Sequence, residues 1–254
     1  MSWQIEHIKI PHSHWEIESL VVPDSGIWGL VGHNGAGKSQ VFSRLVSWSI
    51  HSKAARFGLV AQNPLLQLTE ATVWDQVTWP FRRGRTTLPR ETYNRVSQIL
   101  EDWGLFDLRQ QEPWQLSGGQ QRCLALAAME CLAPDVYLLD EPLENLDHAH
   151  QRVLESKIRK WGQTAAVIIT SHSWQWLLTI AAAGWWCHEG LIPGDLGDLW
   201  YRFAGRPETP LEDLWRRLLD ANMSVTPRAW TDPAWARQEA VKIWDRGIIR
   251  QSIL

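Results

Sequence analysis

The segment that most constrains the fold of this chain is rich in glycine. It reads Gly32-His33-Asn34-Gly35-Ala36-Gly37-Lys38-Ser39 and matches G-x-x-x-x-G-K-[ST] in full. A short apolar run, Ile27–Val31, precedes it and is predicted to be a strand, and Val41, Leu45 and Trp48 follow at helical spacing. A strand, a glycine loop and a helix in this order form a phosphate-binding loop. The pattern therefore favours an α/β fold with a ligand at the carboxyl ends of its strands.

The chemistry of such a loop follows from its backbone. Glycines allow the chain to close around an anion, so that successive N–H groups point inward, and the helix N-terminus adds partial positive charge. We expect Lys38 to reach the β- and γ-phosphates of a nucleotide and the Ser39 hydroxyl to bind Mg²⁺. The predicted phosphate-contacting residues are Gly32, His33, Asn34, Gly35, Ala36, Gly37, Lys38, Ser39 and Gln40, the last at a position where many such loops have threonine.

Composition excludes several other classes of protein. The 254 residues carry a net charge of -3, which gives no sign of a nucleic-acid partner, and their 44% hydrophobic content is ordinary for a globular protein. The longest apolar runs are shorter than the ~20 residues of a membrane helix, and no secretion signal is recognisable. The three cysteines lack metal-site spacing. We therefore expect a soluble protein with reduced thiols.

A pair of carboxylates follows a second apolar run. Val136-Tyr137-Leu138-Leu139 reads as a buried strand and leads directly into Asp140 and Glu141. Because the carboxyl ends of parallel strands meet at one edge of a sheet, both carboxylates are expected beside the phosphate loop. Asp140 is then placed to hold Mg²⁺, and Glu141 to polarise a water for attack on the γ-phosphate.

The remaining pattern divides the chain into regions. Strands are predicted at Gln4–Ile10, Trp15–Val22, Phe57–Ala61, Asp135–Asp140 and Ala165–Thr170, and a hairpin at Trp185–Ile192 turning at Glu189-Gly190. Helices are predicted at Thr72–Phe81, Arg90–Trp103 and Gln120–Leu132, which makes residues 63–133 a helical insert. Beyond Pro193 the pattern is helical and charged, with amphipathic segments at Leu211–Ala221 and from Thr231.

A third motif narrows the family. Leu116-Ser117-Gly118-Gly119-Gln120-Gln121-Arg122 precedes the predicted helix, which Ser117 can cap. Together with Gln62, the run Glu144-Asn145-Leu146-Asp147 and His172, this segment resembles the signature of ABC-type ATPases over roughly residues 1–195. The resemblance implies a P-loop NTPase (RecA-like) core with an N-terminal antiparallel β-subdomain, an inserted α-helical subdomain and a small C-terminal helical appendage. We place the nucleotide-binding domain at residues 1–200 and the appendage at 201–254.

The same resemblance assigns roles to single residues. Glu141, His172 and Gln62 are expected to be catalytic, with His172 as the switch histidine, and Ser39, Gln62 and Asp140 to bind Mg²⁺. Ser117, Gly118, Gly119, Gln120 and Asp147 are expected to contact ATP held by the phosphate loop of a second ATPase subunit, in a homo- or heterodimer. Family members stack adenine on an aromatic side chain before the phosphate loop. Alignment favours His12 slightly, and Trp15 offers the larger π surface.

A finer resemblance suggests a branch of the family. Gln62-Asn63-Pro64-Leu65-Leu66-Gln67-Leu68 followed by Thr72-Val73-Trp74-Asp75-Gln76-Val77 is similar to energy-coupling-factor ATPases, which take up vitamins or cobalt and nickel ions. This implies integral membrane transport subunits as partners, no nucleic acid, and a peripheral position on the cytoplasmic face of the membrane. The alternative is a soluble ABC ATPase acting on nucleic acid or protein complexes. The Gln62 region and the helical insert are expected to form a groove for a short helix of a membrane subunit, with apolar side chains of the insert (Val73, Trp74, Val77, Phe81) suited to docking. The alternative is that the same stripe is buried core, which for any single residue is the favoured assignment.

Overall fold

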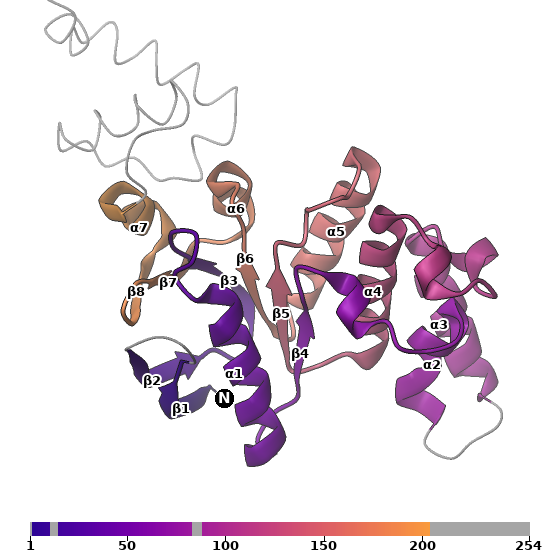
Figure 1. The fold of residues 1–254 in the computed structure, drawn as a ribbon, viewed down its shortest axis with the longest axis horizontal. Coiled ribbons are helices and arrows are strands. Elements are labelled where there is room, and N and C mark those ends of the chain that lie inside the picture. Colours follow the sequence, from indigo (N-terminus) through magenta and orange to yellow (C-terminus); the bar gives the residue numbers. More distant parts are fainter. Residues whose placement is uncertain (1, 11–14, 83–87, 204–254) are drawn as a thin grey trace, which may run out of the picture.

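The computed structural model describes residues 2–10, 15–82 and 88–203. Its central feature is a six-stranded sheet in the order β4-β5-β6-β3-β7-β8 (Figure 1). The strands are β3 (Gly26–Val31), β4 (Phe57–Val60), β5 (Val136–Asp140), β6 (Ala166–Thr170), β7 (Ala183–Cys187) and β8 (Leu191–Asp195). All neighbours pair in parallel except the edge strand β8, which is antiparallel to β7. The carboxyl ends of β3, β5 and β6 therefore lie side by side.

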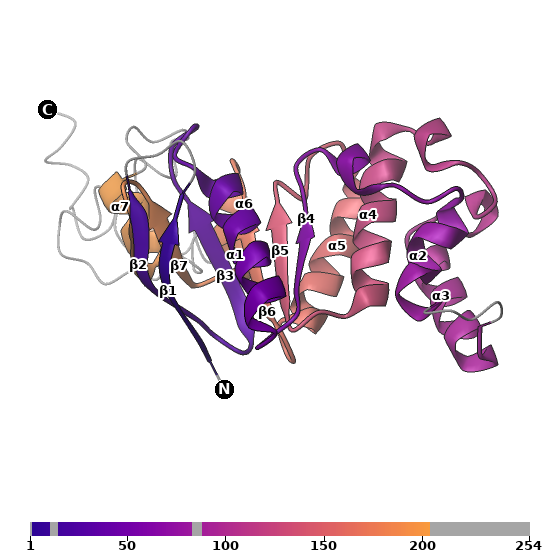
Figure 2. The ribbon, with the colours of Figure 1, turned by 60° about the horizontal axis from the view of Figure 1, so that its bottom comes forward.

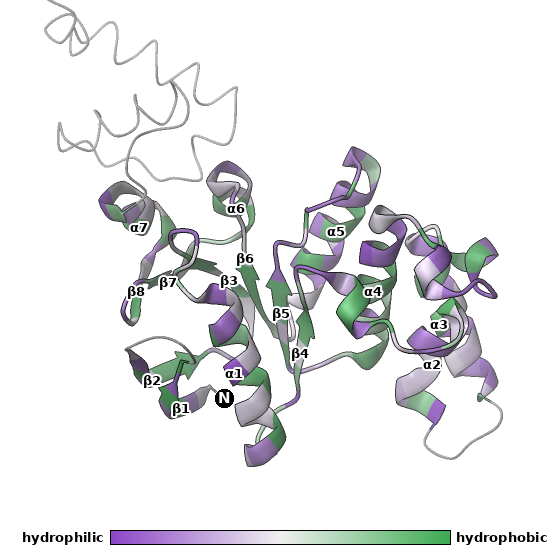
Figure 3. Ribbon diagram, viewed as in Figure 1, coloured by the Kyte–Doolittle hydropathy of each residue, from purple (hydrophilic) through white to green (hydrophobic). Residues whose placement is uncertain are grey.

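The sheet is buried on both faces because its side chains alternate between two cores. In β5, Val136 and Leu138 belong to one core, and Tyr137 and Leu139 belong to the other. The first core lies under α1 (Lys38–Ser52), and the second lies under the helices on the opposite face. Figure 3 shows the central strands hydrophobic along their length, as expected for strands buried on both sides.

The N-terminal segment forms a separate antiparallel pair. Strands β1 (Trp3–Lys9) and β2 (Glu16–Val22) pair directly, and their inward-facing side chains, among them Ile5 and Leu20, join the core under α1. The predicted antiparallel β-subdomain is thereby confirmed. In Figure 2 this pair lies at one end of the molecule and the helices of the insert at the other.

The insert consists of helices in the part of residues 63–133 that the structure describes. They are the 3-10 turns η1 (Pro64–Gln67), η2 (Phe106–Leu108) and η3 (Pro113–Gln115) and the helices α2 (Val73–Arg82), α3 (Arg90–Asp102) and α4 (Gly118–Leu132). The predicted helical insert is therefore confirmed as secondary structure, and the division into domains at residue 200 stays a prediction.

A charged cluster joins the insert to the core helix α5 (His148–Trp161). Lys157 of α5 donates hydrogen bonds to Asp102 of α3 at 2.6 Å and to Glu130 of α4 at 2.8 Å. The indole of Trp103 donates to the same Glu130 at 3.1 Å. We call these four residues the Lys157 cluster. It fixes α4 relative to α5, side by side in both views (Figures 1 and 2).

The second half of the chain completes the sheet. The predicted hairpin is confirmed as β7 and β8. Two helices that are absent from the sequence prediction, α5 and α6 (Trp174–Ile180), cover the sheet. The last described helix is α7 (Leu196–Phe203). The predicted helices at 211–221 and from 231 lie outside the described residues. Among the helices that the structure describes, none combines the length and apolarity needed to cross a bilayer.

Candidate nucleotide-binding site

The phosphate loop connects β3 to α1 at the carboxyl edge of the sheet. Gly37 is the N-cap of α1 and has a φ of +96°, a left-handed conformation that glycine adopts without strain. Gly32 is fixed by a close approach, because a Cβ there would lie 2.6 Å from the carbonyl oxygen of Cys187. The Lys38 ammonium folds back over the loop and donates to the carbonyls of Gly32 at 2.8 Å and His33 at 3.1 Å. The loop is thus closed around a cationic centre.

A pocket of about 440 Å³ lies over this loop. Every predicted catalytic and metal-binding residue contributes to its lining, although they come from four separate parts of the chain. The lining residues are Asn34, Gly35, Ala36, Gly37, Lys38, Ser39, Gln40, Gln62, Asp140, Glu141 and His172. The structure therefore brings together residues that the sequence separates by more than a hundred positions.

The two carboxylates are held by the neighbouring strand. Asp140 ends β5 and is nearly buried, and its Oδ1 accepts a hydrogen bond from the Thr170 hydroxyl at 2.6 Å. Glu141 follows in a left-handed conformation with a φ of +48°, and its N–H donates to the same hydroxyl at 2.9 Å. Thr170 carries no recognisable motif in the sequence, because a threonine at a strand end looks like an ordinary β-branched strand residue.

The Glu141 side chain faces His172. Its Oε2 accepts a hydrogen bond from the backbone N–H of His172 at 3.0 Å, and its Oε1 lies 3.5 Å from the imidazole Nε2. Burial raises the pKa of the Glu141 carboxyl above its usual value, and the hydrogen bond from His172 acts in the opposite direction. Oε1 is buried and accepts no hydrogen bond from the described residues. Glu141 lines the pocket over the phosphate loop, and a carboxylate in such a position is suited to accept a proton from water.

Gln62 follows β4 on a loop that several side chains hold. The guanidinium of Arg122 in α4 is fully buried and donates to the carbonyls of Ala61, at 2.7 Å, and of Gln62. Gln67 closes the same loop by donating to Leu59 O at 2.7 Å and accepting from Ala61 N at 2.9 Å. Arg122 and Gln67 both lie in the sequence motifs described above, but the motifs predict no role for either side chain.

The signature residues lie in a different place. Ser117 accepts from Gln120 N at 3.3 Å, and Ser117 N donates to the Gln120 side chain at 2.9 Å. This reciprocal cap confirms Ser117 as the N-cap of α4, which begins at Gly118, two residues before the predicted start. Gly118 lines a second pocket, of about 350 Å³, with Gln62, Asn63, Pro64, Gln121, Glu144 and Asn145. Gln62 is the residue that lines both this signature pocket and the phosphate pocket.

The other candidates have different outcomes. Asp147 is exposed, caps α5 by accepting from His150 N at 2.8 Å, and does not line the phosphate pocket. Trp15 is half-buried, and a Cβ on Gly37 would lie 3.5 Å from its ring, so the indole supports the phosphate loop from outside the pocket. His12 lies outside the described residues. Which of the two stacks adenine stays open.

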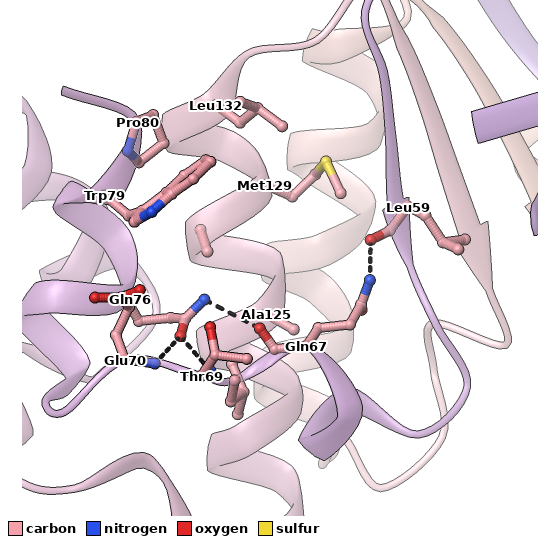
Figure 4. A pocket seen from close by; sticks show the side chains of 12 residues that line it. Leu59, Gln67, Thr69, Glu70, Gln76, Trp79, Pro80, Ala125, Met129 and Leu132 are labelled. Carbon is pink, nitrogen blue, oxygen red and sulfur yellow. Dashed lines mark hydrogen bonds between the residues drawn. The ribbon is translucent and has the colours of Figure 1, made fainter. Parts of the chain in front are cut away.

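The apolar stripe expected to offer a docking surface is mostly core. Val73 and Val77 are fully buried, and Trp74 and Phe81 pack against the same core. A pocket of about 330 Å³ lies instead beside the stripe, between β4, η1, α2 and α4 (Figure 4). Its walls include Trp79, which is 62% exposed, and the apolar side chains of Met129 and Leu132. We call it the insert groove.

Comparison with known proteins agrees with this geometry. The profile of the family described as ABC transporter matches residues 17–144. An energy-coupling factor transporter ATP-binding protein EcfA2 of Symbiobacterium thermophilum is 30% identical over 212 residues, which is 75% of this chain and 73% of that protein. EcfA of Carboxydothermus hydrogenoformans is 30% identical over 184 residues, 63% of this chain and 66% of that protein. For the first curated relatives, the matched segment spans as little as 58% of the relative's own length.

Solved structures support the fold. The cbiO1 protein of Clostridium perfringens, described as part of the ABC transporter complex cbiONQ, has a TM-score of 0.63 and 19% identity. The match covers 85% of this chain and 94% of that one. At this identity the likeness concerns the fold, and the family assignment comes from the profile and the curated relatives. The chain therefore belongs to the ABC transporter family, and energy-coupling factor ATP-binding proteins are among its relatives.

Proposed function

We propose that this protein is the ATP-hydrolysing subunit of an energy-coupling-factor-like membrane importer. The observation that carries the proposal is the phosphate pocket, in which the loop lysine, two carboxylates, a glutamine and a histidine from four segments face one volume of about 440 Å³. A phosphate-binding loop alone would explain why Lys38 and Ser39 line this pocket. It would not explain a half-buried glutamate in the same lining, whose Oε1 accepts no hydrogen bond from the described residues.

In the proposed reaction Glu141 accepts a proton from the attacking water. Burial raises the basicity of its carboxylate, and the His172 N–H holds its orientation. Lys38 neutralises charge on the transferred phosphoryl group, and the loop N–H groups bind the remaining oxygens. His172, with a side chain that is 61% exposed, faces the pocket mouth, where it is placed to contact the γ-phosphate.

The donor set fits a magnesium ion. A serine hydroxyl, a carboxylate and an amide oxygen, from Ser39, Asp140 and Gln62, line one pocket, and hard oxygen donors are those Mg²⁺ prefers. Bound there, the ion would withdraw charge from the β- and γ-phosphates. Asp140 Oδ1 also accepts a hydrogen bond from the Thr170 hydroxyl at 2.6 Å.

The active enzyme is proposed to be a dimer closed by ATP. Gly118 lines a pocket other than the one over the phosphate loop of its own chain. The N–H groups at the start of α4 form a second anion-binding helix terminus, which would close over the ATP of a partner subunit. Whether that partner is a copy of this chain or a related chain is left to experiment.

The insert groove is the proposed contact for the membrane subunit. Trp79 in its wall is 62% exposed. The turn η1, whose Gln67 lines the groove, also carries Leu65 and Leu66, which are 46% and 76% exposed. An amphipathic helix of a membrane partner can bury such a surface. The protein would then lie on the cytoplasmic face of the membrane, with no nucleic-acid partner.

The hydrolytic role is tested by Glu141→Gln. The amide fills the same space but cannot accept the proton, so we expect the hydrolysis rate to fall at least about 100-fold. ATP-dependent dimer formation, followed by light scattering, should persist, because binding and closure need no proton transfer. Hydrolysis within a few-fold of the native rate would exclude Glu141 as the base.

The transport role is tested by affinity isolation from native membranes. We expect integral membrane chains to be recovered with the native protein and lost with Trp79→Glu, which places a charge in the insert groove. Ile50→Glu is the matched control, because Ile50 is 67% exposed on α1 outside the groove. Recovery of soluble complexes or nucleic acid in place of membrane chains would favour a non-transport ABC ATPase.

A further inference from the structure

The inference concerns a buried hydroxyl at the end of β6. Thr170 is the last residue of that strand and pairs in register with Asp140, the last residue of β5. Its side chain is fully buried, and the four remaining residues of β6 are all apolar (Ala166, Val167, Ile168, Ile169). A buried hydroxyl is unfavourable unless hydrogen bonds replace its contacts with water.

The two hydrogen bonds of this hydroxyl both go to the adjoining carboxylate segment. It donates to Asp140 Oδ1 at 2.6 Å and accepts from Glu141 N at 2.9 Å. Because a hydroxyl has a single hydrogen, its donation to Asp140 leaves its lone pairs for Glu141. The short O–H···O distance is typical of a bond to a charged oxygen. One side chain therefore fixes the rotation of Asp140 and the backbone at Glu141.

The backbone at Glu141 needs such support. Its φ of +48° is left-handed, a backbone conformation that is unfavourable for a residue other than glycine. The hydrogen bond to Thr170 holds this conformation and turns the Glu141 side chain toward His172, whose N–H it meets at 3.0 Å. The end of β6 thus positions both carboxylates that face the phosphate pocket.

We propose that Thr170 is a positioning residue that sets the orientation of Asp140 toward magnesium and of Glu141 toward the attacking water. This inference rests on the proposed ATP-binding function. It differs from a packing role, because valine has nearly the same shape and would fill the site equally well. The hydroxyl, and not the volume of the side chain, is assigned the effect.

The test compares ATP affinity in Mg²⁺ with ATP affinity in EDTA, measured by calorimetry on the full chain. For Thr170→Val we expect the ratio of the two affinities to fall about tenfold, the usual worth of one hydrogen bond to a charged group. Affinity in EDTA should stay within about twofold of the native value, because the loop that holds the phosphates is untouched. Thr170→Ser should retain the native ratio.

Thr78→Val is the matched control. Thr78 is also fully buried and donates its hydroxyl to a carbonyl, that of Trp74 at 2.7 Å, but it lies in α2 away from the pocket. Thr78→Val should therefore leave the ratio of the two ATP affinities unchanged. If valine at position 170 prevents folding, the pair Thr170→Ser and Thr170→Ala decides, since these differ by the hydroxyl alone.

Two results would overturn the proposal. One is a native ratio of the two ATP affinities in Thr170→Val or Thr170→Ala. The other is a fall in this ratio in Thr170→Ser as large as that in Thr170→Val, which would point to packing of the methyl group. Failure of the native chain to bind ATP even in EDTA would instead contradict the proposed function itself.

Discussion

At the scale of single residues, the site depends on side chains that hold other side chains. Lys38 and Glu141 face the pocket, but the position of Glu141 is set by Thr170 and His172, and that of Gln62 by Arg122. Arg122 is fully buried, and desolvation lowers the pKa of its guanidinium despite the nearby carboxylates, of which Glu144 has the largest effect. A charge buried at this cost is retained where its hydrogen bonds fix a geometry.

The adenine platform can be decided by two substitutions and two ligands. His12→Ala is expected to weaken ATP binding about tenfold, the worth of one stacked base, and to leave tripolyphosphate binding unchanged. Trp15→Ala is expected to weaken both ligands alike, because its ring supports Gly37 of the phosphate loop. Competition titrations measure both affinities. If Trp15→Ala weakened ATP binding and left tripolyphosphate binding unchanged, Trp15 would be the adenine platform.

At the scale of secondary-structure elements, the Lys157 cluster sets the orientation of the insert. Burial acts against the Lys157 charge, but hydrogen bonds to Asp102 and Glu130 outweigh it and raise its pKa above the usual value. Burial likewise opposes the charge of Asp102, and the hydrogen bonds from Lys157 and Gln98 lower its pKa. Stability from Lys157 is therefore lost as the pH rises through its folded pKa, and stability from Asp102 is lost as the pH falls through its own.

Lys157→Met tests this cluster. The methionine keeps the apolar stem but leaves Glu130, which is 12% exposed, without its cation, so we expect a loss of about 2 kcal/mol in the free energy of unfolding. Urea denaturation at pH 7 measures it. The difference from the native chain should shrink below about pH 4 and above about pH 10. Arg152→Met, exposed on the same helix, is the control, and an equal loss there would assign the effect to helix propensity.

Much of the element order could be predicted because motifs and periodicity are local properties. Gly32–Ser39 and Asp140-Glu141 are read from spacing alone, and the structure places both in one pocket. The helix α5 was passed over although Leu154, Ile158 and Trp161 carry its apolar period. The stripe containing Val73 and Val77 was read correctly as apolar, but periodicity does not say what covers it, and tertiary packing made it core. Thr170 could not be found, because its role depends on a strand register with Asp140.

At the scale of the whole molecule, the two surfaces proposed to contact nucleotide, the phosphate pocket and the signature pocket, are separate pockets of one chain. A closed two-fold dimer would place the phosphate pocket of each subunit against the signature pocket of its partner, so that two identical composite sites form. An isolated subunit should then be a poor enzyme, and its specific activity should rise with protein concentration.

Mixing two inactive variants tests this arrangement for a homodimer. Lys38→Ala disables the phosphate loop and Ser117→Arg disables the signature, so each variant alone should hydrolyse little ATP. A mixed dimer contains one site with both parts intact, and random pairing should restore about a quarter of the native rate. Phosphate release after mixing measures it. If mixing restores nothing while both variants remain folded, the sites are not shared between copies of this chain.

Gln62 has a consequence for how two bound nucleotides influence each other. Its loop borders the phosphate pocket on one side and the signature pocket on the other, and the buried guanidinium of Arg122 ties it to α4. If the first nucleotide displaced this loop, the surface offered to the second nucleotide in the proposed dimer would change. Linkage requires that the second nucleotide change the affinity for the first by the same factor. In the proposed dimer, a wall shared in this way would couple the two sites, so that a nucleotide bound at one site would change the affinity of the other.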